Sequence, residues 1–168
     1  MLVALMFFML TATIIGVSAY VYEQATQTVT QTIKEVATIN LQSSVLGGIN
    51  EGESKSYTKS NVASLGNAIS LTTTAANVYL HLNSDLETQF GRYSVYSITV
   101  KYITVPGGSS HNVGDVAGVM SIASPDPAAV TLDVVGSWSF DLEVSTTAKS
   151  VALDTPTTVT VVVSAESS

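Results

Sequence analysis

Hydrophobic residues dominate the first part of the chain. Residues Met1 to Tyr22 contain no charged side chain, and Glu23 is the first charge. As an α-helix this run would be about 33 Å long, which is enough to cross the hydrocarbon layer of a bilayer. It is apolar around the whole helix, a pattern typical of a segment that is buried on every side. We therefore expect a helix that lies in a membrane or among other helices.

Three interpretations of this segment are open at this point. A cleavable secretory signal would use Val17-Ser18-Ala19 as its small-residue cleavage site, but no basic residue precedes the apolar run. An ordinary membrane anchor would need the apolar run alone. A helix that is stored in the membrane and later packs against copies of itself would continue further, and the next residues favour this third interpretation.

The residues after Glu23 predict that the helix continues. From Glu23 to Leu46 there is neither Gly nor Pro, and Gly47-Gly48 then supplies a stop. The run QTVTQT alternates with a period of two, which favours a strand, but a helical stripe continues past it. The stripe, with spacings of three and four, consists of Ala25, Val29, Ile33, Val36, Ala37, Leu41 and Val45. The sequence thus predicts a helix of about 70 Å over residues 1–48.

Short strands are predicted beyond a polar junction at residues 49–60. They are rich in Val, Ile, Thr and Tyr and are separated by turn clusters such as Pro106-Gly107-Gly108. Their expected ranges are Ala68–Thr72, Val78–Leu82, Tyr93–Val105, Val116–Ile122, Ala129–Val135, Ser139–Val144 and Thr157–Ser164. Strands with such regular turns suggest an antiparallel, immunoglobulin-like sandwich over residues 61–168, with Trp138 and Phe140 in its core. The fold class expected for the whole chain is α+β.

Composition narrows the classes of function. Charged residues make up 11% of the chain, the net charge is −7, and the six basic residues are spread thinly, so nucleic-acid binding is not expected. The chain has no cysteine, which excludes disulfides, zinc ribbons and thiol catalysis. No asparagine begins an N-x-Ser/Thr acceptor pattern, whereas the abundant Ser and Thr leave O-linked sugars open.

The polar segment GGSSHNVGD is the strongest candidate for chemistry. Ser109 or Ser110, His111 and Asp115 could supply a nucleophile, a base and an orienting acid, but a polar turn between strands is the favoured interpretation. His81 is expected to be a surface or packing residue. Five carboxylates could in principle gather around a calcium ion, but no dense Asp-x-Asp-x-Asp loop supports this, and solvated carboxylates are favoured. They are Asp115, Asp126, Asp133, Asp141 and Glu143. We expect no catalytic residue, no metal site and no cofactor, and therefore not an enzyme.

The layout resembles the archaeal type IV pilin superfamily, which includes adhesive pilins and archaellins. The resemblance rests on the uncharged run Met1 to Tyr22, the Gln/Thr-rich extension Glu23 to Gln42, and the sequence LQSSVLGGI at Leu41 to Ile49. Bacterial type IV pilins usually carry a glutamate at the fifth mature position, whereas this chain has Leu5, which fits the archaeal branch. The resemblance implies a short basic leader removed by a prepilin peptidase, storage in the cytoplasmic membrane, and extraction by an assembly machinery.

The function implied is that of a structural subunit of an extracellular type IV pilus-like filament, a helical homopolymer used for adhesion. An archaellin of a motility filament is one alternative, and a membrane-anchored cell-surface binding module is an alternative of another class. Polymerisation would use apolar side chains of the expected helix, namely Leu2, Leu5, Phe7, Phe8, Leu10, Ile14, Ile15, Val29 and Ile33.

Overall fold

The computed structural model describes residues 36–150 and 157–167. The chain divides into two compact units, Met1–Lys34 and Glu35–Ser168, and the description below concerns the second. All nine positions expected to drive polymerisation therefore lie outside the described residues. They are Leu2, Leu5, Phe7, Phe8, Leu10, Ile14, Ile15, Val29 and Ile33.

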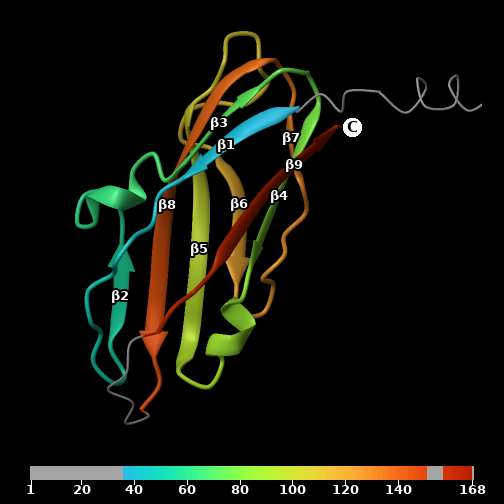
Figure 1. The fold of residues 1–168 in the computed structure, drawn as a ribbon. Coiled ribbons are helices and arrows are strands. Elements are labelled where there is room, and N and C mark those ends of the chain that lie inside the picture. The colour runs from blue at the N-terminus through green and yellow to red at the C-terminus, as the bar shows by residue number, and fades with distance from the viewer. Residues whose placement is uncertain (1–35, 151–156, 168) are drawn as a thin grey trace, which may run out of the picture. The chain divides into compact units, whose positions relative to one another are not determined.

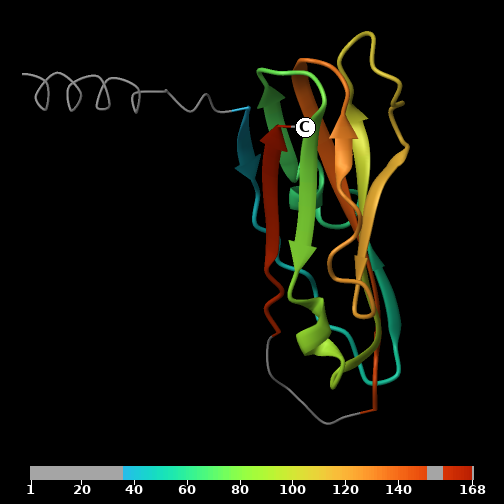
Figure 2. The same ribbon diagram turned by 90° about the vertical axis from the view of Figure 1, so that its right-hand side faces the viewer.

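Two antiparallel sheets make up the described unit (Figures 1 and 2). The larger sheet has the strand order β1-β3-β8-β5-β6, and β2 also pairs with β8. Its strands are β1 (Ala37–Leu41), β2 (Ser54–Tyr57), β3 (Ile69–Thr73), β5 (Tyr93–Thr104), β6 (Val116–Ser121) and β8 (Gly136–Ala148). The smaller sheet has the order β7-β4-β9, from β7 (Val130–Leu132), β4 (Val78–Ser84) and β9 (Val161–Ser167). Two short 3-10 helices, η1 (Ala63–Leu65) and η2 (Leu86–Gln89), complete the unit.

The expected α+β fold class is wrong for the described residues, because the helix predicted to run to Leu46 is not formed there. Ala37–Leu41 is instead strand β1, and Gln42 to Asn50 have no regular secondary structure. The physical reason is Ile39, an apolar residue that does not belong to the predicted helical stripe. With Ile39 included, this stretch alternates strictly between apolar and polar side chains, which suits a half-buried edge strand. Pairing with β3, from Ala37↔Thr73 to Leu41↔Ile69, then decides between the two patterns.

Strand β8 organises the larger sheet. One of its edges pairs with β5 along nearly its full length. Its other edge is shared: β3 pairs with residues Gly136 to Phe140, and β2 pairs with Val144 to Thr147. Strand β2 lies in the polar stretch that was expected to be a junction between domains, so this stretch belongs to the sheet.

Period-two alternation places the core between the sheets. In β4 the side chains alternate strictly between buried and partly or fully exposed, and in β5 the residues Tyr96, Ile98, Val100 and Tyr102 face inward. Trp138 and Phe140 are buried as expected. Gly118 of β6 marks a close approach, because a Cβ atom there would lie 2.9 Å from Cδ1 of Leu82 in the opposite sheet. All seven predicted strands overlap observed ones, with shifted ends.

Candidate functional site

In the β5–β6 loop, the hydroxyls of Ser109 and Ser110 are not hydrogen-bonded to the imidazole of His111, as a nucleophile would be to its general base. The Ser109 hydroxyl donates a hydrogen bond to Oδ1 of Asp133, at 2.6 Å, and accepts one from the backbone N–H of His111, at 3.1 Å. Ser110 also turns to Asp133, to which its hydroxyl and its backbone N–H both donate. The loop therefore keeps the predicted serines and histidine close together. Both serine hydroxyls, however, donate to Asp133, which was not part of the predicted nucleophile–base–acid group.

The imidazole of His111 is held by structural contacts. Its Nε2 lies 2.7 Å from the carbonyl oxygen of Thr131, and a carbonyl only accepts, so this nitrogen carries the proton and donates. The ring stacks on Tyr102 with 4.8 Å between centroids and meets Trp138 edge-on at 5.9 Å. This arrangement fixes the loop to β7 and to the core, and among the described residues no hydrogen bond joins the imidazole to the hydroxyl of either serine.

Asp133 is the electrostatic centre of this loop. Partial desolvation raises its pKa, but the hydrogen bonds from Ser109 and Ser110 outweigh this effect and lower the pKa to about 2. The carboxylate therefore stays charged at any pH near neutrality and is a poor general base. Asp115, the acid of the predicted group, instead accepts hydrogen bonds from the backbone and side chain of Asn112, three residues before it.

Tyr102 carries an unusual buried hydroxyl. The residue is 1% exposed, and its Oη has no hydrogen-bond partner among the described residues. Desolvation, with smaller effects of Asp133 and Asp115, raises its pKa to about 12. The hydroxyl is thus neutral near pH 7, and the Tyr102 ring packs against the rings of His111, Trp138 and Phe140, which indicates a packing role rather than an acid–base role.

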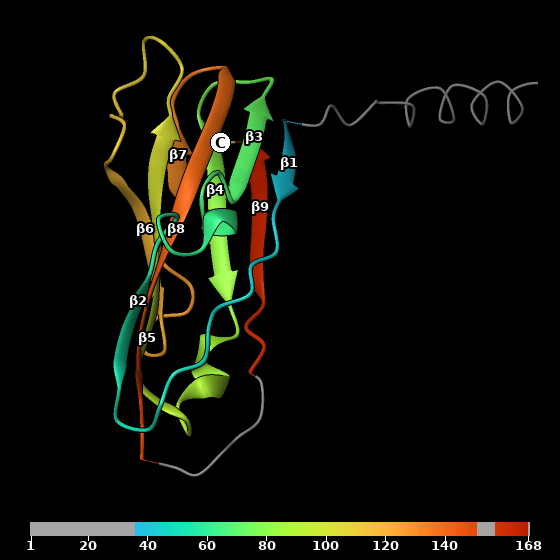
Figure 3. The same ribbon diagram turned by 90° about the vertical axis from the view of Figure 1, so that its left-hand side faces the viewer.

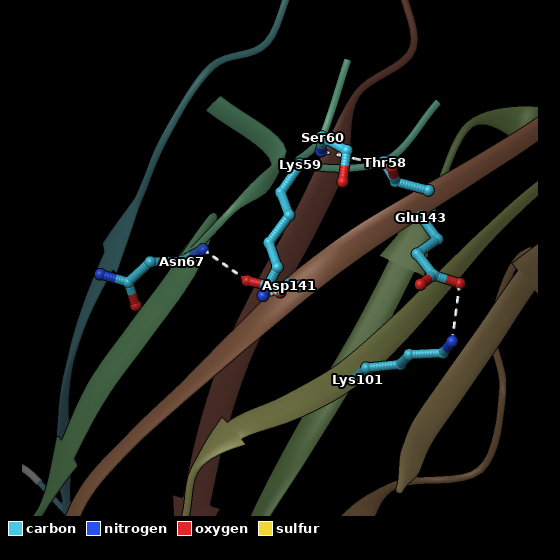
Figure 4. Close-up of polar contacts among 7 residues, drawn as sticks. All are labelled: Thr58, Lys59, Ser60, Asn67, Lys101, Asp141 and Glu143. Atoms are coloured by element: carbon cyan, nitrogen blue, oxygen red, sulfur yellow. Dashed lines mark hydrogen bonds and ion pairs between the residues drawn. The ribbon is translucent and has the colours of Figure 1, made fainter. Parts of the chain in front are cut away.

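A second polar cluster lies on β8 where its partner strands change (Figure 4). The Asp141 carboxylate forms an ion pair with Nζ of Lys59, at 2.7 Å, and accepts the backbone N–H of Asn67, at 2.8 Å. On β5 and β8, Lys101 and Glu143 form another ion pair at 2.8 Å. Each carboxylate therefore has a lysine partner instead of pointing toward a shared cation.

The remaining candidates are separate from these clusters. Asp126 is exposed in the β6–β7 loop. His81 lies on the outer face of the smaller sheet, with Nε2 at 2.9 Å from Glu166, which agrees with the surface role expected for it. Among residues 36–150 and 157–167, no group of three or more His, Asp or Glu side chains is placed to hold a metal ion.

A cleft that the sequence did not reveal lies against the inner face of the larger sheet. It has a volume of about 1330 Å³, with Tyr57, Tyr96 and Val144 on its floor. Its walls come from the irregular segment Leu41 to Glu51 and from Thr157 to Val161. The Tyr57 hydroxyl donates to the carbonyl of Gly47 and so ties the wall to the floor. The lining is largely apolar and hydroxyl-rich, includes the charged residues Glu51, Arg92 and Lys149, and contains no nucleophile–base pair.

Neither a protein-family model nor a curated protein matches this chain. In the part of the chain that the structure describes, no helix is long and apolar enough to span a bilayer. The polar side chains of residues 36–150 and 157–167 form contacts that hold loops and strands together, and within these ranges they do not form a reactive constellation.

Proposed function

We propose that this chain is a structural subunit of an extracellular type IV pilus-like filament, and that its β unit forms the outer layer. The proposal is carried by the presence, in one chain, of two segments with different chemistry. An uncharged run from Met1 to Tyr22 is followed, from Ala37 onward, by a hydroxyl-rich antiparallel β unit. A subunit needs an element that stays in the membrane before assembly and a folded part that withstands the outside.

The chemistry of the β unit supports a structural role rather than an enzymatic one. The serines and the histidine of the β5–β6 loop are used to fix that loop, and the lysine-paired carboxylates fix strand positions. Partners under this proposal are other copies of the chain, the membrane before assembly, a prepilin peptidase and an assembly machinery. Under this proposal a polymerising helix would have to end before Ala37, because strand β1 begins there.

A membrane-anchored cell-surface binding module is the second candidate, and one observation favours it. The helical extension that distinguished a filament subunit from an anchored module is replaced at Ala37–Leu41 by a strand of the β unit. The cleft against Tyr57 and Tyr96 would then be the first place to look for a ligand. This candidate predicts single copies in the membrane and no filaments.

Electron microscopy of material sheared from cells that make the full chain separates the two candidates. Substitution Ile14→Glu places a charge in the uncharged run and should abolish filaments, because burial of an unpaired carboxylate is strongly unfavourable. Val135→Glu is the matched control, since Val135 is an exposed valine of the β unit. Filaments in the wild type and the control but not in Ile14→Glu support the proposal. Filaments from Ile14→Glu contradict it, and membrane-bound monomers in the wild type favour the second candidate.

A further inference from the structure

Strand β1 is an edge strand with a free row of backbone groups. The hydrogen bonds from Thr74 N to Val36 O and from Gln42 N to Ala68 O show that even-numbered residues bond to β3. The N–H and C=O groups of Ala37, Ile39 and Leu41 therefore point away from β3, and no described residue pairs with them. Figure 3 shows β1 at the margin of the larger sheet, beside β9.

This edge lacks the features that normally prevent strands from pairing between molecules. No charged residue and no proline occurs from Val36 to Asn50, and Leu41 and Val45 are 50% and 90% exposed. Native edges are usually protected by charges, proline, bulges or a covering segment. In a chain with a net charge of −7, a stretch without carboxylates is also where a second copy meets the least repulsion.

The other edges are less suitable. Strand β6 is closed at one end by the Ser121–Ser124 turn, in which each residue's N–H bonds to the other's carbonyl. Strand β2 carries Lys55, and β9 carries Glu166. Strand β7 is only three residues long.

We propose that β1 pairs in antiparallel fashion with β1 of a second copy, with Ile39 on the two-fold axis, so that the larger sheets of two molecules become continuous. The sequence Ala-Thr-Ile-Asn-Leu is self-complementary in this register. Ala37 faces Leu41 of the second copy, Ile39 faces its equivalent, and Thr38 faces Asn40. Apolar side chains thus meet on the inner face and a hydroxyl meets an amide on the outer face. The inference does not depend on the filament proposal.

The contact between two five-residue strands is small against the roughly 1,200 Å² that a stable interface buries, so the test traps it covalently. The chain has no cysteine, and Thr38 and Asn40 are exposed. Full-length Thr38→Cys and Asn40→Cys proteins are mixed in detergent and oxidised gently. In the proposed register their Cα atoms lie about 4.5 Å apart, within disulfide range, whereas residue 38 lies more than about 7 Å from its own equivalent.

The expected result is a covalent species of twice the 17.5 kDa chain in the mixture, several-fold more abundant than in either variant alone. Thr72→Cys replaces Thr38→Cys in the matched control, because Thr72 pairs with Thr38 on the same face, one strand inward. The proposal would be overturned if the Thr38→Cys and Asn40→Cys mixture gave no cross-linked species. It would also be overturned if the control mixture or the single variants cross-linked as much as this mixture. Cross-linking of Thr38→Cys alone would indicate another register and also overturn it.

Two blocking variants complete the design. Ala37→Pro, placed in both cysteine proteins, removes an outward N–H and leaves the ladder to β3 intact, so cross-linking should fall to the level of the single variants. Leu41→Lys places a charge on the exposed edge and should have the same effect without a change of backbone. Circular dichroism checks that both variants fold. Undiminished cross-linking in a folded blocking variant contradicts pairing through β1.

Discussion

One ion pair lies at the position where β8 exchanges β3 for β2 as its partner strand. Between the last residue paired with β3, Phe140, and the first paired with β2, Val144, the Asp141 carboxylate holds Lys59 and the backbone N–H of Asn67. The Asp141 side chain is only 10% exposed, whereas that of Lys59 is 59% exposed. The carboxylate of this ion pair is therefore largely enclosed by protein, whereas the lysine side chain is exposed to water.

A double-mutant cycle with Lys59→Met and Asp141→Asn measures this coupling. Water around Lys59 screens the Coulomb energy, so the value lies far below that of a buried pair, but the enclosed carboxylate keeps it above that of an open surface pair. We expect a coupling free energy of about 1 kcal/mol. The assay is urea unfolding of the full chain in detergent, followed by circular dichroism, for the wild type, both single variants and the double variant.

The matched control is the pair Lys101 and Glu143, with nearly the same N···O distance, 2.8 Å against 2.7 Å, and side chains 33% and 37% exposed. Lys101→Met and Glu143→Gln should give a coupling of about 0.3 kcal/mol, the range of exposed pairs. Added salt should reduce the control coupling more than that of Lys59 and Asp141. A coupling of Lys59 to Asp141 no larger than the control would refute the idea that the enclosed carboxylate strengthens the pair.

Three further predictions use the same unfolding assay. Asp133→Asn should lower the free energy of unfolding by about 1 kcal/mol at pH 7. Folding lowers the pKa of Asp133 to about 2, so the stabilisation by its carboxylate is complete above about pH 4 and is lost as the pH falls through 2. Wild type and variant should therefore have similar unfolding free energies near pH 2. Gly118→Ala should destabilise by about 1–3 kcal/mol because the new methyl group meets Leu82, whereas Gly107→Ala, with open space around it, should be nearly neutral. Tyr102→Phe should cost no stability, because the hydroxyl that it removes is buried without a partner among the described residues; a loss above about 1 kcal/mol would reveal an unrecognised partner.

The strands that the sequence predicted correctly are those in which local pattern and tertiary environment agree. Strand β5 alternates from Tyr96 to Tyr102, and the inward side chains of this stretch are the buried ones. Strand β1 was missed because its apolar residues fit a helical stripe as well as an alternation, and pairing with β3 decides. Strand β2, with the sequence SKSY, has no apolar pattern, so its extended state depends on pairing with β8.

The candidate site was predictable only within one loop. Ser109, Ser110 and His111 are close in sequence, and the structure keeps them close in space. The partner of both serines, Asp133, directly follows β7, and the sequence pattern suggested it only as a possible calcium ligand. Sequence spacing within a loop carries no information on which strand end faces that loop, because strand order decides this.

The start of β1 also limits where the β unit can be relative to the uncharged run. Between Glu23 and Val36 the chain has room for at most about 3.5 Å per residue, or roughly 50 Å, even when fully extended. If Met1–Tyr22 lies in a membrane or a filament core, the β units of neighbouring copies are therefore tethered to it by a segment of at most that length. Confinement of this kind raises the effective concentration of β1 edges, so a pairing too weak to persist in solution can form between tethered copies.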